Sequence, residues 1–419
     1  MRVLFTVSDW PGHWSAMVPL GWALQAAGHE VRVVCAPSQE EPLARAGLTA
    51  VPVLDGWDMA FQGRLQNYLN AGKDLWPYPE PPLHPVTGEP LADLADFDLG
   101  GWFKENVPVL SERARRSTDA AVGFARWWRP DVQVHDLVSI EGLLLGRVLG
   151  IPSAVHLWGP AGTDEHEPGL TLVPVDMSRS FERYAVGEPG FDRLTHVIDP
   201  NPAALAPALL GAERLPVRFV PYNGPGAVPG WLAELPERPR VCVVWGTSVS
   251  EMFGEVSFTV PKVVEALSDL GVEVVLTLTG ADRDRMEGEL PDGVRLLERV
   301  PLHLLLPHCD LVVHHGGAGC VMTALAAGVP QLALTNGVEQ RLNADRIAAA
   351  GAGLGLSNAA VEVAQIRAAA ERLLRDPAHR AAAERLRAEN EARPAPADLV
   401  RTLEQLAARQ PAAVGGAHR

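Results

Sequence analysis

The stretch LVVHHGGAGCVMTALAAG at residues 311–328 restricts the choice of fold more than any other part of the chain. Residues 311–313 form a β-branched apolar run, which is typical of a buried strand. Two histidines follow, then small residues at 316–319 that favour a turn, then an apolar helical pattern at 320–327 that Gly328 ends. This order of strand, glycine-rich turn and helix predicts an α/β architecture.

The same stretch has the geometry of an anion site. Unpaired backbone N–H groups and the positive end of a helix dipole converge at such a turn. Side chains would block a phosphate there, and glycine and alanine avoid this. An ordinary glycine-rich turn is the alternative for the glycines alone. His314 and His315 favour the phosphate site, because they add hydrogen-bond donors where a diphosphate would lie.

Strands alternate with helical patterns in both halves of the chain, which predicts parallel sheets with helices on both faces. Strands are expected at 3–7, 30–36, 50–53, 132–135, 153–156, 241–245, 273–278, 294–297, 311–313 and 331–334. A helix is expected at 15–27. The weak periodicity of 55–120 predicts loops and short helices.

A proline- and glycine-rich segment separates the two halves. Residues 218–240 hold five prolines and three glycines, a composition typical of a linker. We therefore expect an N-terminal domain at 1–217 and a C-terminal domain at 241–393. A final helix at 394–410 follows, and the tail from 411 to 419 is expected to fray.

Charge and composition exclude several classes of function. The chain has 419 residues, enough for two domains, and a formal net charge of −15. This charge argues against nucleic acid or an anionic membrane as a partner. The N-terminal strand reaches Asp9 too soon for a signal sequence or a membrane span. Scattered cysteines without a CxxC pair indicate buried thiols, so we expect a cytoplasmic protein: Cys35, Cys242, Cys309 and Cys320.

Two polar residues are candidates for acid–base chemistry. His13 follows the first strand at its carboxyl end, where ligands bind in doubly wound sheets, and imidazole suits proton transfer near neutral pH. Asp136 follows the strand at 132–135, and neighbouring parallel strands would bring both residues to one rim. A surface histidine and a helix N-cap aspartate are the alternatives. Asp9 is a rival partner for His13.

These motifs together resemble the inverting, nucleotide-sugar-dependent glycosyltransferases of family 1, which have two facing Rossmann-like domains (the GT-B fold). The similarity is greatest to the bacterial antibiotic branch, which transfers deoxysugars from TDP donors to polyketide-type aglycones. It extends from MRVLFT at the start to the last helix. The resemblance implies a deep interdomain cleft, a terminal helix that crosses back to the N-terminal domain, and His13 as general base with Asp136 as its partner.

The resemblance also implies a donor site, which lies mainly in the C-terminal half. His314 matches the phosphate-contacting histidine, and the pair Glu339–Gln340 matches the residues that read the sugar. Cys320 replaces the usual threonine or serine, and Glu339 replaces the usual aspartate. The full set of donor-binding candidates is Gly12, Thr247, Ser248, Val300, His314, Gly317, Ala318, Gly319, Cys320, Glu339 and Gln340.

Aromatic residues point to an acceptor pocket in the N-terminal half. Nine of the eleven tryptophans occur by residue 158, and residues 76–90 include six prolines. We interpret this region as a wall over a large apolar pocket, with Trp10, Trp76 and Trp158 as acceptor contacts. A stiff surface loop beside a Trp-rich core is the alternative.

The leading hypothesis is transfer of a sugar from a TDP-sugar to a hydroxyl of an apolar aglycone, without a metal or other cofactor. A UDP-sugar-dependent antibiotic-inactivating enzyme, a C-glycosyltransferase, a nucleotide-sugar epimerase and a non-catalytic partner protein remain as alternatives. A dinucleotide-dependent oxidoreductase is disfavoured, because neither DWPGHW nor WGTSVS supplies GxGxxG. A homodimer and an auxiliary activator protein stay open as partners.

Overall fold

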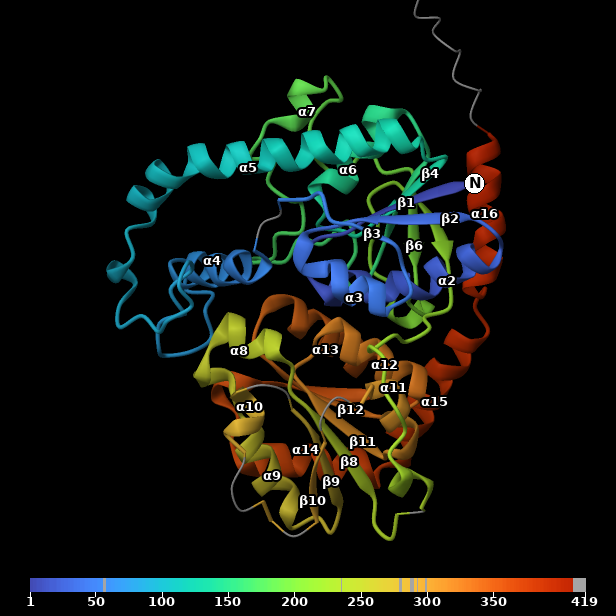
Figure 1. The fold of residues 1–419 in the computed structure, drawn as a ribbon. Coiled ribbons are helices and arrows are strands. Elements are labelled where there is room, and N and C mark those ends of the chain that lie inside the picture. The colour runs from blue at the N-terminus through green and yellow to red at the C-terminus, as the bar shows by residue number, and fades with distance from the viewer. Residues whose placement is uncertain are drawn as a thin grey trace, which may run out of the picture.

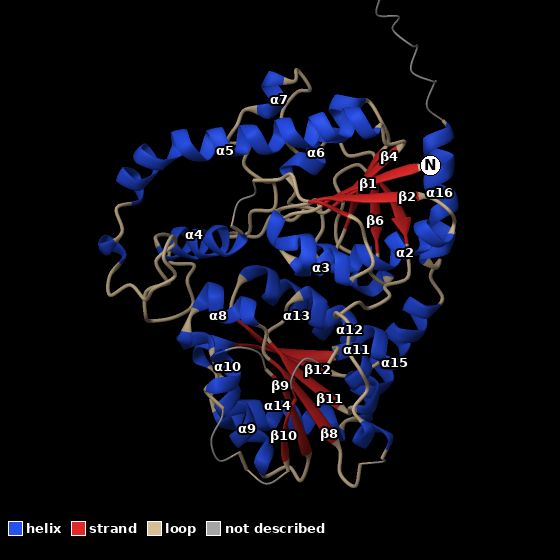
Figure 2. Ribbon diagram, viewed as in Figure 1, coloured by secondary structure: helices blue, strands red, loops and turns tan. Residues whose placement is uncertain are grey.

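The structure, a computed structural model, consists of two α/β domains with the terminal helix running beside the first (Figure 1). It describes residues 1–55, 58–234, 236–278, 281–286, 290–291, 293–297 and 300–409. Each domain has a sheet with helices around it (Figure 2). The arrangement is that of the GT-B fold expected from the sequence.

The N-terminal sheet has seven strands, all parallel, in the order β3-β2-β1-β4-β5-β6-β7. Its strands are β1 Arg2–Thr6, β2 Glu30–Val34, β3 Ala50–Val51, β4 Val132–His135, β5 Ser153–His156, β6 His196–Asp199 and β7 Glu213–Pro216. The helices of this domain are α1 Pro11–Trp14, α2 Val18–Ala26, α3 Glu40–Arg45, α4 Met59–Ala71, α5 Leu99–Trp128, α6 Ile140–Leu149 and α7 Ser180–Arg183.

The C-terminal sheet has six strands, again all parallel, in the order β10-β9-β8-β11-β12-β13. Its strands are β8 Arg240–Val244, β9 Glu273–Thr277, β10 Val294–Leu297, β11 Leu311–His314, β12 Gln331–Thr335 and β13 Gly353–Ser357. The remaining helices are α8 Thr247–Phe253, α9 Val260–Ser268, α10 Ala281–Asp284, α11 Leu302–Leu305, α12 Ala318–Ala327, α13 Val338–Ala349, α14 Val363–Arg375, α15 Pro377–Glu391 and α16 Pro396–Ala408.

The register of the central strands explains how the first site residues come together. β1 lies between β2 and β4, with Val3 opposite Val132 and Thr6 opposite His135. The apolar side chains of these strands are fully buried, which fixes the register. Residues that follow β1 and β4 therefore emerge at the same edge of the sheet.

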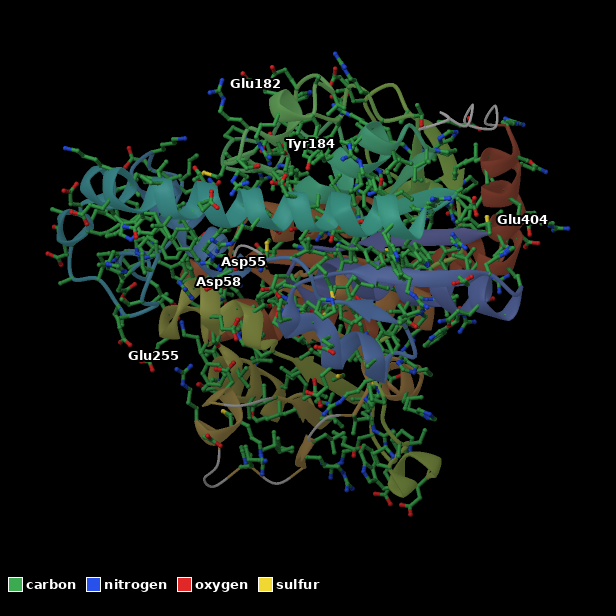
Figure 3. All side chains as sticks on the ribbon, turned by 45° about the horizontal axis from the view of Figure 1, so that its top comes forward. Asp55, Asp58, Glu182, Tyr184, Glu255 and Glu404 are labelled. Atoms are coloured by element: carbon green, nitrogen blue, oxygen red, sulfur yellow. The ribbon has the colours of Figure 1, made fainter. Side chains whose placement is uncertain are left out.

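Helix α16 packs against α2 of the N-terminal domain, far from its neighbours in sequence. Leu399, Val400 and Leu403 are buried in the same core cluster as residues of β1 and α2. Glu404 Oε1, labelled in Figure 3, lies 2.9 Å from His29 Nε2 at the end of α2. The last helix of the chain is thus part of the N-terminal core.

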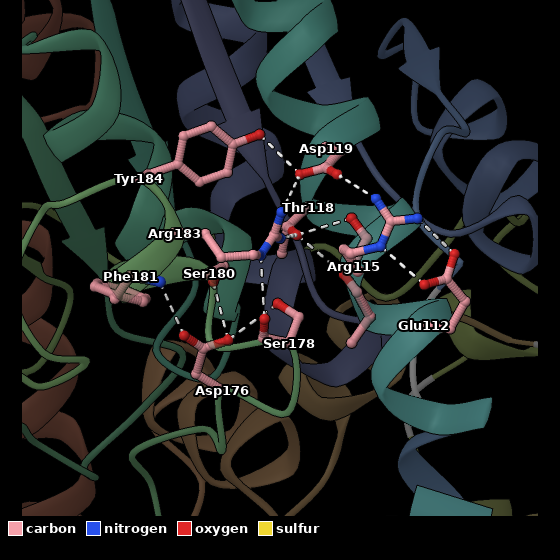
Figure 4. Close-up of polar contacts among 11 residues, drawn as sticks. Glu112, Arg115, Thr118, Asp119, Asp176, Ser178, Ser180, Phe181, Arg183 and Tyr184 are labelled. Atoms are coloured by element: carbon pink, nitrogen blue, oxygen red, sulfur yellow. Dashed lines mark hydrogen bonds and ion pairs between the residues drawn. The ribbon is translucent and has the colours of Figure 1, made fainter. Parts of the chain in front are cut away.

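Several elements differ from the sequence-based expectation. The region 55–120 was expected to hold loops and short helices, but it contains the 30-residue helix α5. Pro108 lies inside this helix and glycines begin it, so local signals favoured a break. The outer side of α5 is held by polar contacts: Asp119 accepts hydrogen bonds from Arg183 and Tyr184, both at 2.8 Å (Figure 4).

Three strands escaped prediction: β6, β7 and β13, the last of which contains glycines. In β13, a Cβ at Gly355 would lie 3.0 Å from Ala344 Cβ on α13, so glycine allows the helix to approach the sheet. The described part of the chain contains no helix with the length and apolarity that a membrane span requires.

Candidate active site

His13 lies in the short helix α1, although the sequence predicted a loop up to residue 15. Pro11 occupies the first turn of α1 and its fixed φ favours a helical start. A 3₁₀ turn follows, and a separate helix, α2, begins at Val18 with Pro19 in its first turn. His13 consequently projects from a short rigid turn directly after β1, and its side chain is partly exposed.

Ser8 lies between His13 and Asp136, which were expected to touch each other directly. Ser8 Oγ is 2.8 Å from His13 Nδ1, and the Ser8 backbone N–H donates to Asp136 Oδ2 at 2.5 Å. Nothing in the type or spacing of Ser8 distinguished it in the sequence. The histidine and the carboxyl are therefore linked through a serine that sequence analysis missed.

Asp136 is fully buried and does not cap the helix after it. Ser139 is the N-cap of α6, because its Oγ accepts from Gly142 N–H at 3.0 Å. Burial raises the pKa of the Asp136 carboxyl to about 6, against hydrogen bonds from the backbone and hydroxyl of Ser8 and the backbone of Val138. The helix-cap alternative for Asp136 is thus wrong.

The rival partner, Asp9, is turned away from the histidine. Its carboxylate accepts hydrogen bonds from Ser38 Oγ and, at 2.8 Å, from Gln39 Nε2. Burial lowers the pKa of His13 to about 3, so the imidazole stays neutral in the protein without substrates. Among the described residues, none accepts from or donates to its Nε2, which leaves this nitrogen for a substrate.

Trp158 connects the histidine to the other domain. Its ring stacks on the His13 imidazole with centroids 4.2 Å apart and planes inclined by 19°. Its Nε1–H donates to Glu339 Oε1 on α13 at 3.0 Å. Burial raises the pKa of Glu339, and this hydrogen bond from Trp158 opposes the rise. Trp158 thus contacts both His13 of the N-terminal domain and Glu339 of the C-terminal domain.

His314 does not offer its ring to a ligand, contrary to the expectation that it contacts phosphate. It is fully buried, its Nδ1 accepts from Gly316 N–H at 2.9 Å, and its Nε2 lies 3.0 Å from Gln331 Oε1. Both ring nitrogens are therefore used to hold the turn after β11. His314 is therefore a structural residue that connects the turn after β11 to Gln331 at the start of β12.

His315, by contrast, hydrogen-bonds to no described residue. Its Nδ1 is buried without a partner, and its ring meets Trp245 edge-on with ring centroids 6.2 Å apart. Burial lowers the pKa of His315 to about 3. A Cβ at Gly317 would collide with His315 Nε2, so only glycine permits this close approach.

The start of α12 presents the free N–H groups that an anion needs. The first helical bond runs from Val321 N–H to Gly317, which leaves the N–H groups of Ala318, Gly319 and Cys320 outside the helical ladder. A Cβ at Gly319 would meet no atom within 4 Å, so this side of the turn is open. Burial raises the pKa of Cys320 to about 12, and its thiol stays protonated.

The N-terminal domain packs against the start of α12. A Cβ at Gly159, directly after Trp158, would lie 2.6 Å from Ala318 Cβ. Ala318 is accordingly buried together with the core of the N-terminal domain. The candidate diphosphate site and the candidate base therefore lie on either side of residues 158–159.

The other donor candidates occupy the surrounding turns. Ser248 is near the β8–α8 turn, where a Cβ at Gly246 would lie 3.6 Å from Ser248 Oγ and 3.5 Å from His315 Cε1. Thr247 starts α8, and its side chain lies outside the described residues. Val300 packs against the core around α11, and Gly12 is exposed beside Trp10, itself partly exposed.

Among the described residues, only the oxygen of the Gln340 side-chain amide has hydrogen-bond partners. Its Oε1 accepts from the backbone N–H of Asn336 at 2.8 Å and from Asn336 Nδ2 at 3.1 Å. No described residue accepts from its Nε2. The amide nitrogen of Gln340 is therefore the part of the side chain available to a ligand, beside Glu339.

Trp76 was expected to contact the acceptor, but the structure places it against the C-terminal domain. Its ring stacks on Phe253 with centroids 5.7 Å apart and planes inclined by 7°. Its Nε1–H donates to Glu80 O at 2.7 Å. The proline-rich segment 76–90 is thus in apolar contact with α8.

Family models for the erythromycin biosynthesis protein CIII-like N-terminal and C-terminal domains match residues 22–246 and 261–406. The chain is 37% identical to the 3-alpha-mycarosylerythronolide B desosaminyl transferase of Saccharopolyspora erythraea, over 97% of this chain and 99% of that protein. It is 35% identical to the 10-deoxymethynolide desosaminyltransferase of Streptomyces venezuelae, with 97% of each covered.

Solved structures are similar over almost the whole chain. The spinosyn rhamnosyltransferase SpnG complexed with thymidine diphosphate has a TM-score of 0.72 and 31% identity, covering 96% of this chain and 100% of that one. SpnG complexed with the spinosyn aglycone gives the same values. The glycosyltransferase SnogD from Streptomyces nogalater has a TM-score of 0.72 and 30% identity, covering 97% and 99%.

Proposed function

Since the chain belongs to the erythromycin biosynthesis protein CIII-like glycosyltransferases, we propose that it transfers a deoxysugar from a TDP-sugar to an apolar polyketide-type aglycone. Relatives named desosaminyl transferases and a solved relative that holds TDP or an aglycone support these substrates. The observation that carries the proposal is the contact series from His13 through Trp158 to Glu339, which brings a proton acceptor and a sugar-reading acid to one place from two domains.

His13 acts as the general base on the aglycone hydroxyl. Its Nε2 takes the hydroxyl proton as the oxygen forms a bond to the anomeric carbon, and the bond from that carbon to the diphosphate breaks on the opposite side. The configuration of the sugar is therefore inverted. In the free protein, the low pKa of His13 keeps this nitrogen deprotonated.

Ser8 transmits the charge of Asp136 to the imidazole. The contacts fit His13 Nδ1–H donating to Ser8 Oγ while the Ser8 hydroxyl donates to the Asp136 carboxylate. This order fixes the tautomer with its lone pair on Nε2 and stabilises the imidazolium that develops. Trp158 holds the plane of the ring by stacking.

The departing TDP is stabilised by the start of α12 and by His315. Backbone N–H groups at residues 318–320 and the helix dipole offset the negative charge that develops on the diphosphate. His315, not His314, supplies the imidazole contact, because both ring nitrogens of His314 are paired, whereas no described residue hydrogen-bonds to the ring of His315. Glu339 and Gln340 contact the sugar.

Differential ligand binding followed by product analysis tests this function. We expect TDP to raise the melting temperature more than UDP does, because binding to the folded state stabilises it by mass action. With TDP-desosamine or TDP-rhamnose and a macrolactone or anthracyclinone, wild-type protein should release TDP and form a glycoside with inverted configuration. His13→Ala should keep the TDP shift and form no glycoside. A larger shift with UDP, or sugar release independent of acceptor, would favour the UDP-dependent enzyme or the epimerase.

A further inference from the structure

A tyrosine of the N-terminal domain is buried inside the C-terminal domain, next to the sugar-reading residues. Tyr78 is 7% exposed and belongs to the core cluster formed around β8, α8 and α9. It lies on the proline-rich segment 76–90, whose Trp76 stacks on Phe253. The segment thus inserts a phenol group across the domain boundary.

The Tyr78 hydroxyl is connected to Gln340 through one residue. Tyr78 Oη donates to Asn336 Oδ1, and the Asn358 Nδ2 group donates to both Tyr78 Oη at 3.0 Å and Asn336 Oδ1 at 2.8 Å. Asn336 in turn donates from its backbone N–H and its Nδ2 to Gln340 Oε1. A continuous series of hydrogen bonds therefore runs from the N-terminal domain to Gln340.

This series determines which way the two amides point. Asn336 must direct its oxygen at Tyr78 and Asn358, so its nitrogen is directed at Gln340. Gln340 directs its oxygen at both the backbone N–H and the Nδ2 of Asn336, and its Nε2 remains for the ligand. Burial raises the pKa of Tyr78 to about 12, and the phenol remains a donor throughout the physiological range.

The docking of the segment does not depend on this hydroxyl. Arg64 of α4 donates from Nε to Pro85 O at 3.0 Å and from NH1 to Glu251 O at 3.4 Å. Asn67 of the same helix donates to Met252 O at 2.8 Å. Removing the Tyr78 hydroxyl alone therefore leaves the interface between α4, the segment and α8 in place.

We propose that Tyr78 is a positioning residue that sets the orientation of Gln340 through Asn336, so that the donor sugar is read correctly only when segment 76–90 is docked. The inference rests on the proposed function, because it takes Gln340 to contact the sugar. It adds a dependence of donor-sugar recognition on a loop of the acceptor domain.

The variant Tyr78→Phe tests this, because it keeps the ring and its packing. Tyr68→Phe is the matched control: its hydroxyl donates to Leu94 O at 2.8 Å and Phe97 O at 3.0 Å, entirely within the N-terminal domain. We expect Tyr78→Phe to leave the TDP dissociation constant within about 2-fold while raising the KM for TDP-rhamnose about 5- to 10-fold, as the loss of one hydrogen bond allows. Tyr68→Phe should change neither value.

A double-mutant cycle with Gln340→Ala separates positioning from general loss of structure. Gln340→Ala should raise the KM for TDP-rhamnose, and adding Tyr78→Phe should then have no further effect. If Tyr78→Phe behaves like Tyr68→Phe, or adds fully to Gln340→Ala, the positioning role is refuted while the proposed function stands. If Gln340→Ala itself leaves the KM unchanged, or wild-type protein binds no TDP, the site assignment of the proposed function is refuted and this role with it.

Discussion

Removal of the Ser8 hydroxyl should slow sugar transfer without loosening the site. In Ser8→Ala the backbone N–H remains, and it continues to hold Asp136 Oδ2 at 2.5 Å. What is lost is the hydroxyl, which lies 2.8 Å from His13 Nδ1 and also hydrogen-bonds to the Asp136 carboxylate. The variant therefore isolates the connection between the carboxyl and the imidazole.

The size of the effect follows from the charge on the imidazole in the transition state. A hydrogen bond to a charged group contributes about 1.5–3 kcal/mol. Since about 1.4 kcal/mol corresponds to a tenfold change in rate, the single-turnover rate should fall about 10- to 100-fold. TDP affinity should be unchanged, because Ser8 lies in the N-terminal domain.

Single-turnover rates at saturating donor and aglycone provide the measurement. Ser38→Ala is the control, because Ser38 Oγ donates to Asp9 and makes no contact with His13. Asp136→Asn should be at least as slow as Ser8→Ala. If Ser8→Ala turns over at the wild-type rate while Asp136→Asn is slow, the carboxyl acts on His13 without the serine and the relay is wrong.

Three further predictions concern the same site. The single-turnover rate should fall as pH drops through about 6, where Asp136 becomes protonated, and Asp136→Asn should remove this dependence; His13, with its pKa of about 3, stays neutral there. His315→Ala should weaken TDP binding about 10- to 100-fold by calorimetry, whereas His314→Ala should mainly lower the melting temperature; the opposite pattern would restore His314 as the phosphate contact. Trp158→Phe keeps a ring against His13 but leaves Glu339 without its donor, so the KM for the TDP-sugar should rise about 5- to 10-fold; a change confined to the aglycone KM would return Trp158 to the acceptor site.

The fold could be predicted from the sequence wherever a local signal and the tertiary structure agree. The apolar run before His314 predicted strand β11, and the helical pattern that ends at Gly328 predicted helix α12. Both signals are local, because β-branched residues favour a strand and a glycine in the left-handed conformation ends a helix. Parallel neighbouring strands were enough to expect His13 and Asp136 at one edge. Helix α5 was missed because its packing outweighs Pro108, a contribution that no local pattern contains.

The errors at the site have a different cause. Two adjacent histidines, His314 and His315, stand at the end of β11, and the contact with Gln331 on β12 distinguishes His314 as the one that points inward. Similarly, Ser8 is defined as a link by two distances that arise when β1 and β4 pair. Trp76 stacks on Phe253, which lies more than 170 positions further along the chain. Side-chain partners across elements are set by tertiary register, and composition does not carry that information.

The place of α16 has a consequence for how the protein is made. Leu399, Val400 and Leu403 complete the core beneath α2, yet they follow the whole C-terminal domain in the sequence. Until then, the nascent N-terminal domain has an uncovered apolar face while the whole C-terminal domain is being synthesised. Completion of the first domain must therefore await the synthesis of α16, which follows the C-terminal domain, and a truncation within this helix would disturb the half of the protein that was synthesised first.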